Sequence, residues 1–78
     1  MSARKTDTVA LRKRMIECGY KSAIDLHRAS SISRTTIGNI LAGKAQPSAT
    51  IMEKLMTVLE IAPEEAGKVF FSSDLRGA

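Results

Sequence analysis

Residues that begin and end helices divide the chain into short segments. The spacing of these residues restricts the fold more than any other feature of the sequence. Ser22, Ser33 and Ser48 each stand before an apolar pattern with helical spacing. A serine in that place caps a helix by accepting a backbone N–H. Gly19 and Gly43 follow such patterns, as glycine does where a helix ends. No stretch alternates apolar and polar residues over the length of a strand. The sequence therefore predicts an all-α fold.

Five short helices joined by short connections are expected. They cover residues 7–18, 22–30, 33–42, 48–59 and 63–71. Pro63 suits a first helical turn, and Glu64 and Glu65 favour the positive end of the helix dipole. A chain of 78 residues has room for one compact bundle. We expect a flexible basic N-terminus at 1–6, a folded domain at 7–71 and a loose tail at 72–78.

The apolar residues of these helices recur at spacings that place them on one side, where a shared core is expected. The set comprises Leu11, Met15, Ile16, Cys18, Leu26, Ile32, Ile37, Ile40, Leu41, Ile51, Met52, Leu55, Met56, Val58 and Leu59.

Several classes of protein are disfavoured by composition. No apolar run approaches the roughly 20 residues that cross a bilayer, and the basic N-terminus is not followed by the apolar segment of a signal peptide. Cys18 is the single cysteine, so neither an internal disulfide nor a cysteine-based zinc site is expected. His27 is the single histidine. The sequence contains neither a pair of acidic residues typical of general acid–base catalysis nor a glycine-rich phosphate-binding loop. We therefore expect a cytoplasmic protein that is not an enzyme and needs no cofactor or metal.

Charge is unevenly distributed along the chain. The net charge is +4, but residues 1–46 carry nine basic and three acidic side chains, whereas residues 47–78 carry three and five. The run Arg12-Lys13-Arg14 is expected to be a solvated helix face. A basic N-terminal half is able to bind a polyanion. Clustered basic residues of this kind are typical of proteins that bind nucleic acids.

The polar side of the predicted helix 33–42 is its most informative feature. Arg34, Thr35, Thr36 and Asn39 place hydrogen-bonding groups near its N-terminus, and no acid follows Asp25 until residue 53. Arginine can bind guanine O6 and N7, asparagine can bind adenine N6 and N7, and a threonine methyl can contact the thymine methyl. These residue types on a short helix predict DNA recognition.

A longer pattern strengthens this interpretation. Residues 26–48 read Leu-x-x-x-Ser-x-Ile-Ser-Arg-Thr-Thr-Ile-x-Asn-Ile-x-x-Gly-Lys-x-x-Pro-Ser, and Leu55 and Leu59-Glu60-Ile61 follow. The pattern resembles that of the Cro/cI (Xre-type) helix-turn-helix family over residues 9–66. The resemblance implies a lambda-repressor-like DNA-binding domain and a transcription regulator, of repressor type and of phage or mobile-element origin.

The resemblance also implies roles for individual residues. Helix Ser33–Ala42 would be the recognition helix. Bases of double-stranded DNA would be contacted by Arg34, Thr35 and Asn39, with a base or phosphate contact added by Thr36. Phosphates would be contacted by Lys21, Ser22, Ser33, Lys44 and Gln46. A homodimer on a palindromic operator is expected.

Five positions depart from the family pattern or from its phage repressors. His27 replaces a small residue, and Ala23 replaces a phosphate-binding glutamine. Ser31 replaces the usual glycine of the turn, and therefore a strained or left-handed backbone is expected there. Met15 and Leu41 stand where several phage repressors hold a buried Arg–Glu pair. Such an apolar replacement can be neutral or stabilising, because no charges need to be desolvated.

Phe70 and Phe71 are adjacent, so a helix cannot bury both on one narrow stripe. We expect one to pack on the core and the other to reach a second subunit. Two further functions remain open: an antitoxin-like protein that mainly binds a protein partner, and an interaction domain that has lost DNA binding. Arg34 and Asn39 argue against the latter.

Overall fold

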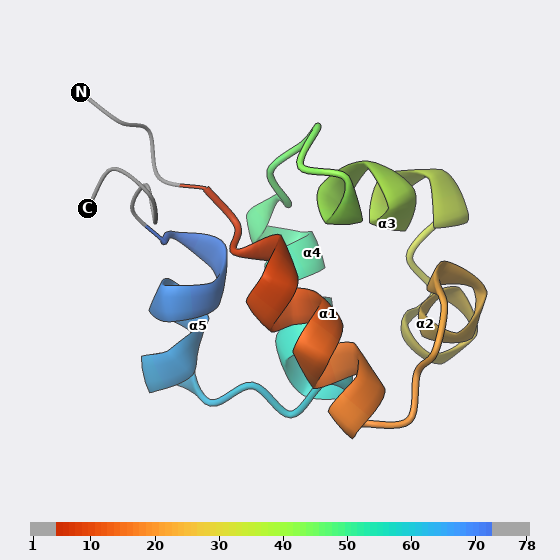
Figure 1. Cartoon of the computed structure of the whole chain (residues 1–78), viewed down its shortest axis with the longest axis horizontal. Helices are drawn as coiled ribbons and strands as arrows, with labels where there is room; N and C mark the ends of the chain where they lie inside the picture. Colours follow the sequence, from red (N-terminus) through yellow and green to blue (C-terminus); the bar gives the residue numbers. More distant parts are fainter. Residues whose placement is uncertain (1–4, 73–78) are drawn as a thin grey trace.

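Five α-helices follow one another along residues 5–72, the part of the chain that the computed structural model describes (Figure 1). They are α1 (Thr8–Glu17), α2 (Ala23–Ser30), α3 (Arg34–Leu41), α4 (Ala49–Val58) and α5 (Pro63–Phe70). No strand occurs among these residues, which confirms the all-α prediction. The predicted bounds are too wide by a residue at most ends, because the prediction counted the capping residues as part of each helix.

The first four helices begin at the side-chain caps that the sequence indicated. Asp7, Ser22, Ser33 and Ser48 each accept a hydrogen bond from the backbone N–H three residues later, at 3.1–3.4 Å. Each bond satisfies a donor that the first turn of a helix leaves without an intrahelical partner. The helix starts are therefore determined locally.

Helices α2 and α5 show variants of this arrangement. The carboxylate of Asp25 accepts the backbone N–H of Lys21 at 3.2 Å, one residue before the cap. Ala62, which precedes α5, has no side-chain oxygen, and its own N–H donates to Glu65 Oε1 at 3.3 Å. Pro63 is the first residue of α5, as predicted.

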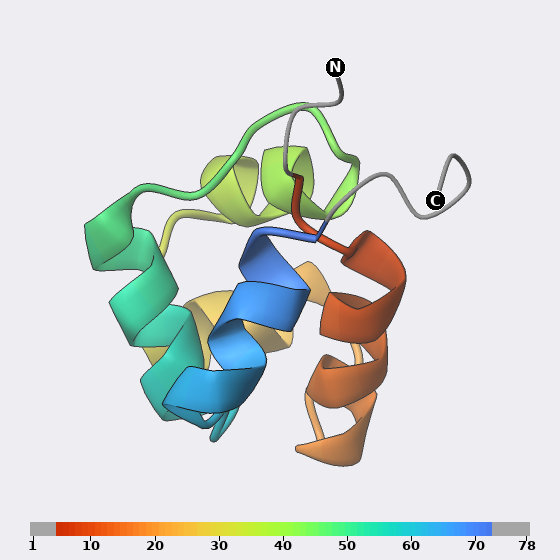
Figure 2. The ribbon, with the colours of Figure 1, turned by 90° about the vertical axis from the view of Figure 1, so that its left-hand side faces the viewer.

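The five helices enclose one core in which Leu59 and Phe70 are fully buried. Figure 2 shows α1, α4 and α5 side by side, with α3 lying across one end of them. Ile16 was expected in the core but is 67% exposed. The prediction was wrong because Leu11, Met15 and Cys18 share one side of α1, whereas Ile16 is turned about 100° from Met15.

Two arginines of α1 bind the ends of other helices. Arg14 donates through Nε to the carbonyl of Leu59 at 2.8 Å and through Nη2 to that of Glu60 at 2.7 Å, just after α4. Arg12 donates to the carbonyl of Leu41, the last residue of α3, at 3.2 Å. A cation at a helix C-terminus also stabilises the negative end of its dipole. The run 12–14 is therefore not simply a solvated face.

The outer ends of the described chain lie together. Lys5 and Ser72 exchange two backbone hydrogen bonds of 2.9 Å, and the N–H of Asp7 donates to the carbonyl of Val69 at 2.6 Å. Hydrogen-bonded backbone thus continues two residues before and one residue beyond the expected 7–71 domain. The rest of the predicted N-terminal segment and tail, residues 1–4 and 73–78, lies outside the described residues.

Candidate DNA interface

The turn between α2 and α3 sets the angle of the second helix. Ser31 ends α2 with φ 65°, in the left-handed region, as its replacement of glycine predicted. The buried hydroxyl of Ser30 donates to the carbonyl of Leu26 at 2.6 Å and accepts the N–H of Ile32 at 3.2 Å. These bonds supply partners for backbone groups that the turn would otherwise leave without them.

His27 takes part in the same turn. Its Nδ1 lies 2.6 Å from the carbonyl oxygen of Ile32. Since a carbonyl can only accept, Nδ1 must carry the proton. The half-buried imidazole therefore ties the last turn of α2 to the residue that precedes the cap of α3. Nothing in the sequence indicated this hydrogen bond between His27 and Ile32.

One side of α3 is fixed in the core. Ile37 and Ile40 are 2% exposed and Leu41 is 8% exposed, as their helical spacing predicted. Ser33 caps the start of the helix and Arg12 binds the carbonyl at its end. The helix is therefore held at both termini and along its buried face.

The predicted base-reading residues of α3 lie outside its buried side chains. Arg34, Thr35 and Asn39 are exposed. Thr36 is half-buried, and its hydroxyl accepts a hydrogen bond from Ser33 Oγ at 2.8 Å. Three of the four predicted residues are thus exposed, whereas the hydroxyl of Thr36 belongs to the helix cap.

Four of the predicted phosphate ligands are exposed at helix starts or in the loop after α3. Ser22 and Ser33 are the caps of α2 and α3, and Lys21 precedes Ser22. Lys44 follows Gly43, whose φ of +78° reverses the chain after α3. Backbone amides at helix starts and nearby ammonium groups are the donors that phosphate prefers.

Gln46, the fifth predicted phosphate ligand, is engaged within the protein. Its Oε1 accepts hydrogen bonds from the N–H and the hydroxyl of Thr6, and its Nε2 donates to the carbonyl of Phe70. Sequence reasoning missed this arrangement because the partners lie 40 and 24 residues away. One N–H of the amide is left for any other acceptor.

The two phenylalanines separate as expected, but only one suits an interface. Phe70 is 0% exposed, whereas Phe71 is 43% exposed. Phe70 is therefore the one that packs on the core, because its ring is enclosed by its own subunit. Phe71 remains the candidate.

No group of three or more His, Cys, Asp and Glu among residues 5–72 is placed to hold a metal ion. None of the described helices combines the length and the apolar character that crossing a membrane requires.

Two short helices joined by a left-handed turn, with the second presenting Arg, Thr and Asn outward, define a helix-turn-helix DNA-binding domain. Comparison with known protein families matches residues 10–68 to the Cro/C1-type HTH DNA-binding domain. The chain belongs to this family, which confirms the resemblance seen in the sequence. A comparison with curated proteins found no match.

Proposed function

We propose that the chain is a sequence-specific transcription regulator that inserts α3 into the major groove of double-stranded DNA. It would act in the cytoplasm as a repressor of phage or mobile-element type. The observation that carries the proposal is the outward face of α3, where Arg34, Thr35 and Asn39 are exposed on a helix held from its other side. A fixed helix lets these side chains meet bases at small entropic cost.

Each residue of this face has a chemical task in the proposal. The guanidinium of Arg34 donates to guanine O6 and N7, and the amide of Asn39 exchanges hydrogen bonds with adenine N6 and N7. The methyl group of Thr35 contacts a thymine methyl. Thr36, whose hydroxyl is used in the cap, would contribute a base or phosphate contact from the edge of the helix.

Phosphate contacts would position α3 without reading sequence. Lys21 and Lys44 supply ammonium groups, and Ser22 and Ser33 stand at helix starts where N–H groups and the dipole attract an anion. Gln46 has the remaining N–H of its amide to offer. These contacts fix the register of the domain on the duplex.

Two copies would bind one operator. A single domain of this size covers one half-site and buries about 600–1,000 Å². A two-fold axis would place the two recognition helices about 34 Å apart on a palindrome. Phe71, exposed after α5 and outside α3, would contribute to the contact between copies.

Selection of bound sequences from a random pool of duplexes tests the proposal. We expect an enriched palindrome with wild-type protein, and loss of preference at separate base positions with Arg34→Ala and Asn39→Ala. Lys68→Ala is the matched control, because it removes an exposed charge from α5 and should leave the selected sequence unchanged. Folded wild-type protein that enriches no sequence would contradict the proposal.

A further inference from the structure

The backbone of Ile32 is held on both sides by side chains of α2. Its N–H donates to the hydroxyl oxygen of Ser30 at 3.2 Å, and its carbonyl oxygen accepts the Nδ1 proton of His27 at 2.6 Å. The hydroxyl of Ser30 in turn donates to the carbonyl of Leu26 at 2.6 Å. We call the contacts of Ser30 and His27 with Ile32 the turn clamp.

The turn clamp spans a residue in an unfavourable conformation. Ser31 lies between Ser30 and Ile32 with φ 65°. Left-handed backbone is costly for a residue that carries a Cβ, and the side chain of Ser31 is exposed, so burial does not hold it there. Without the clamp, Ser31 would spend part of its time in the right-handed or extended regions. Each of these sends the chain out of the turn in another direction.

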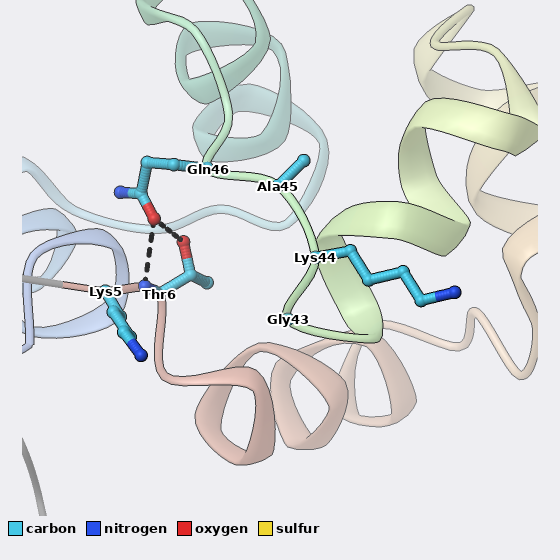
Figure 3. Close-up of a pocket in the computed structure, with 6 residues that line it drawn as sticks. All are labelled: Lys5, Thr6, Gly43, Lys44, Ala45 and Gln46. Atoms are coloured by element: carbon cyan, nitrogen blue, oxygen red, sulfur yellow. Dashed lines mark hydrogen bonds between the residues drawn. The ribbon is translucent and has the colours of Figure 1, made fainter.

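The direction of the chain at this point decides the position of the near end of α3. The carbonyl of Ile32 belongs to the peptide that leads into Ser33, the cap of α3. The far end is held separately, since Gln46 in the loop after α3 accepts two hydrogen bonds from Thr6 (Figure 3). A change at the turn would therefore tilt α3 about its far end. Arg34, its first residue and a proposed base contact, would move most.

We propose that the turn clamp keeps Ser31 left-handed and thereby sets the angle at which α3 enters DNA, with His27 as a positioning residue for base recognition. This inference rests on the proposed function. It gives His27 a task in sequence discrimination that its ring performs through the backbone of Ile32. It also makes His27 and Ser31 one unit, because the bond from His27 offsets the cost that Ser31 adds.

Two substitutions of His27 that differ in the place of one N–H test the positioning role. The amide of His27→Asn can put an N–H where Nδ1 stands, whereas that of His27→Gln reaches the place of Nε2. We expect His27→Gln to weaken binding to the selected palindrome by about five- to thirtyfold per bound copy, the population lost when a left-handed residue loses its support. His27→Asn should bind nearly as wild type does.

The reference in this experiment is a scrambled duplex of the same length, measured with each variant well below its Tm. Binding to that duplex rests on sequence-independent phosphate contacts and should change little. A residue that served stability alone would not alter the ratio of the two affinities in folded protein. If His27→Asn and His27→Gln discriminate alike, the role assigned to the Nδ1 proton is wrong.

A double-mutant cycle tests the link between His27 and Ser31. Ser31→Gly removes the cost of the left-handed backbone, and it opens no cavity because the side chain is exposed. The discrimination that His27→Ala loses in the wild-type background should therefore be largely restored by Ser31→Gly. If His27→Ala fails to fold, His27→Gln takes its place in the cycle. Additive effects of the two substitutions would overturn the link.

The tautomer of His27 supplies a readout that needs no DNA. Two-bond ¹H–¹⁵N correlation spectra of the free protein, at a pH where the ring is neutral, should show the proton on Nδ1. A proton on Nε2 would overturn the turn clamp. If wild-type protein enriches a palindrome and His27→Gln reads it unchanged, this inference fails and the proposed function stands. If the wild-type protein enriches no sequence, the proposed function fails and the positioning role falls with it.

Discussion

Replacing Gly38 by alanine should stabilise the domain, and the size of the effect follows from its surroundings. Gly38 is the fifth of the eight residues of α3, and its carbonyl accepts the N–H of Ala42 at 2.9 Å. A Cβ built at this position meets no atom within 4 Å. The substitution therefore creates neither a clash nor a contact, and its effect comes from the lower entropy of the unfolded chain. We expect a gain of about 0.4–1 kcal/mol in the free energy of unfolding.

Thermal unfolding followed by circular dichroism measures this gain. For a domain of this size, about 1 kcal/mol corresponds to 4–8 °C, so Tm should rise by about 2–8 °C. Gly43→Ala is the matched control, because a Cβ there also meets open space but the backbone has φ +78°. The same methyl group should lower the free energy of unfolding by about 1–2 kcal/mol at that position.

The comparison of the two variants can refute the reasoning. If Gly38→Ala melted below wild type, residue 38 would not lie in the interior of a regular helix. If Gly43→Ala raised Tm as well, the left-handed conformation assigned to Gly43 would be wrong. Either result would remove the structural basis for the orientation of α3.

Four further predictions follow from the same contacts. Ile37→Ala should cost about 2–5 kcal/mol through lost burial and a cavity, whereas Arg34→Ala should change Tm little and weaken operator binding; equal melting of the two would contradict the orientation of α3. Raising salt from about 50 to 200 mM should weaken DNA binding at least tenfold, and constant affinity in a filter-binding titration would count against phosphate contacts. Arg14→Met should lower the free energy of unfolding in urea by about 1–2 kcal/mol, because the carbonyls of Leu59 and Glu60 lose a charged donor; an unchanged midpoint would show that water replaces the guanidinium. Phe71→Ala should reduce cooperative binding to a palindrome in footprinting and sedimentation, and an unaltered two-copy complex would exclude this ring from the interface.

The helix boundaries could be predicted from the sequence because the signals that set them are local. Ser22, Ser33 and Ser48 accept hydrogen bonds from amides three residues away, and Gly43 supplies the left-handed turn after α3. Such interactions depend only on residues within one helical turn. The exposed face of α3 was predictable for the same reason, since burial of Ile37 turns the polar residues outward.

Long-range hydrogen bonds could not be predicted in this way. Arg14 binds carbonyls 45 and 46 residues away, and Gln46 binds Thr6 across 40 residues. Nothing in the residues beside Arg14 or Gln46 distinguishes them from solvated side chains, because the partners are backbone groups or a small hydroxyl. Only the packing of complete helices brings these groups together.

The rotation of a helix about its axis was predicted less well than its ends. Ile16 lies on the outer side of α1 although it is as apolar as its buried neighbour Met15. Phe70 and Phe71 are chemically identical, and one is 0% and the other 43% exposed. The core selects between such neighbours by shape and by the angle at which helices meet, which short sequence patterns do not contain.

The two arginine contacts of α1 also bear on how fast the domain unfolds. The turn between α2 and α3 closes over a few residues, whereas Arg12 and Arg14 reach partners 29 to 46 residues away. Closing long loops costs more entropy, so contacts between distant residues tend to form late in folding. We expect both guanidinium groups to engage after the transition state. Their removal would then accelerate unfolding and leave the folding rate almost unchanged, so that α1 sets the lifetime of the folded domain while α2 and α3 set the speed at which it forms.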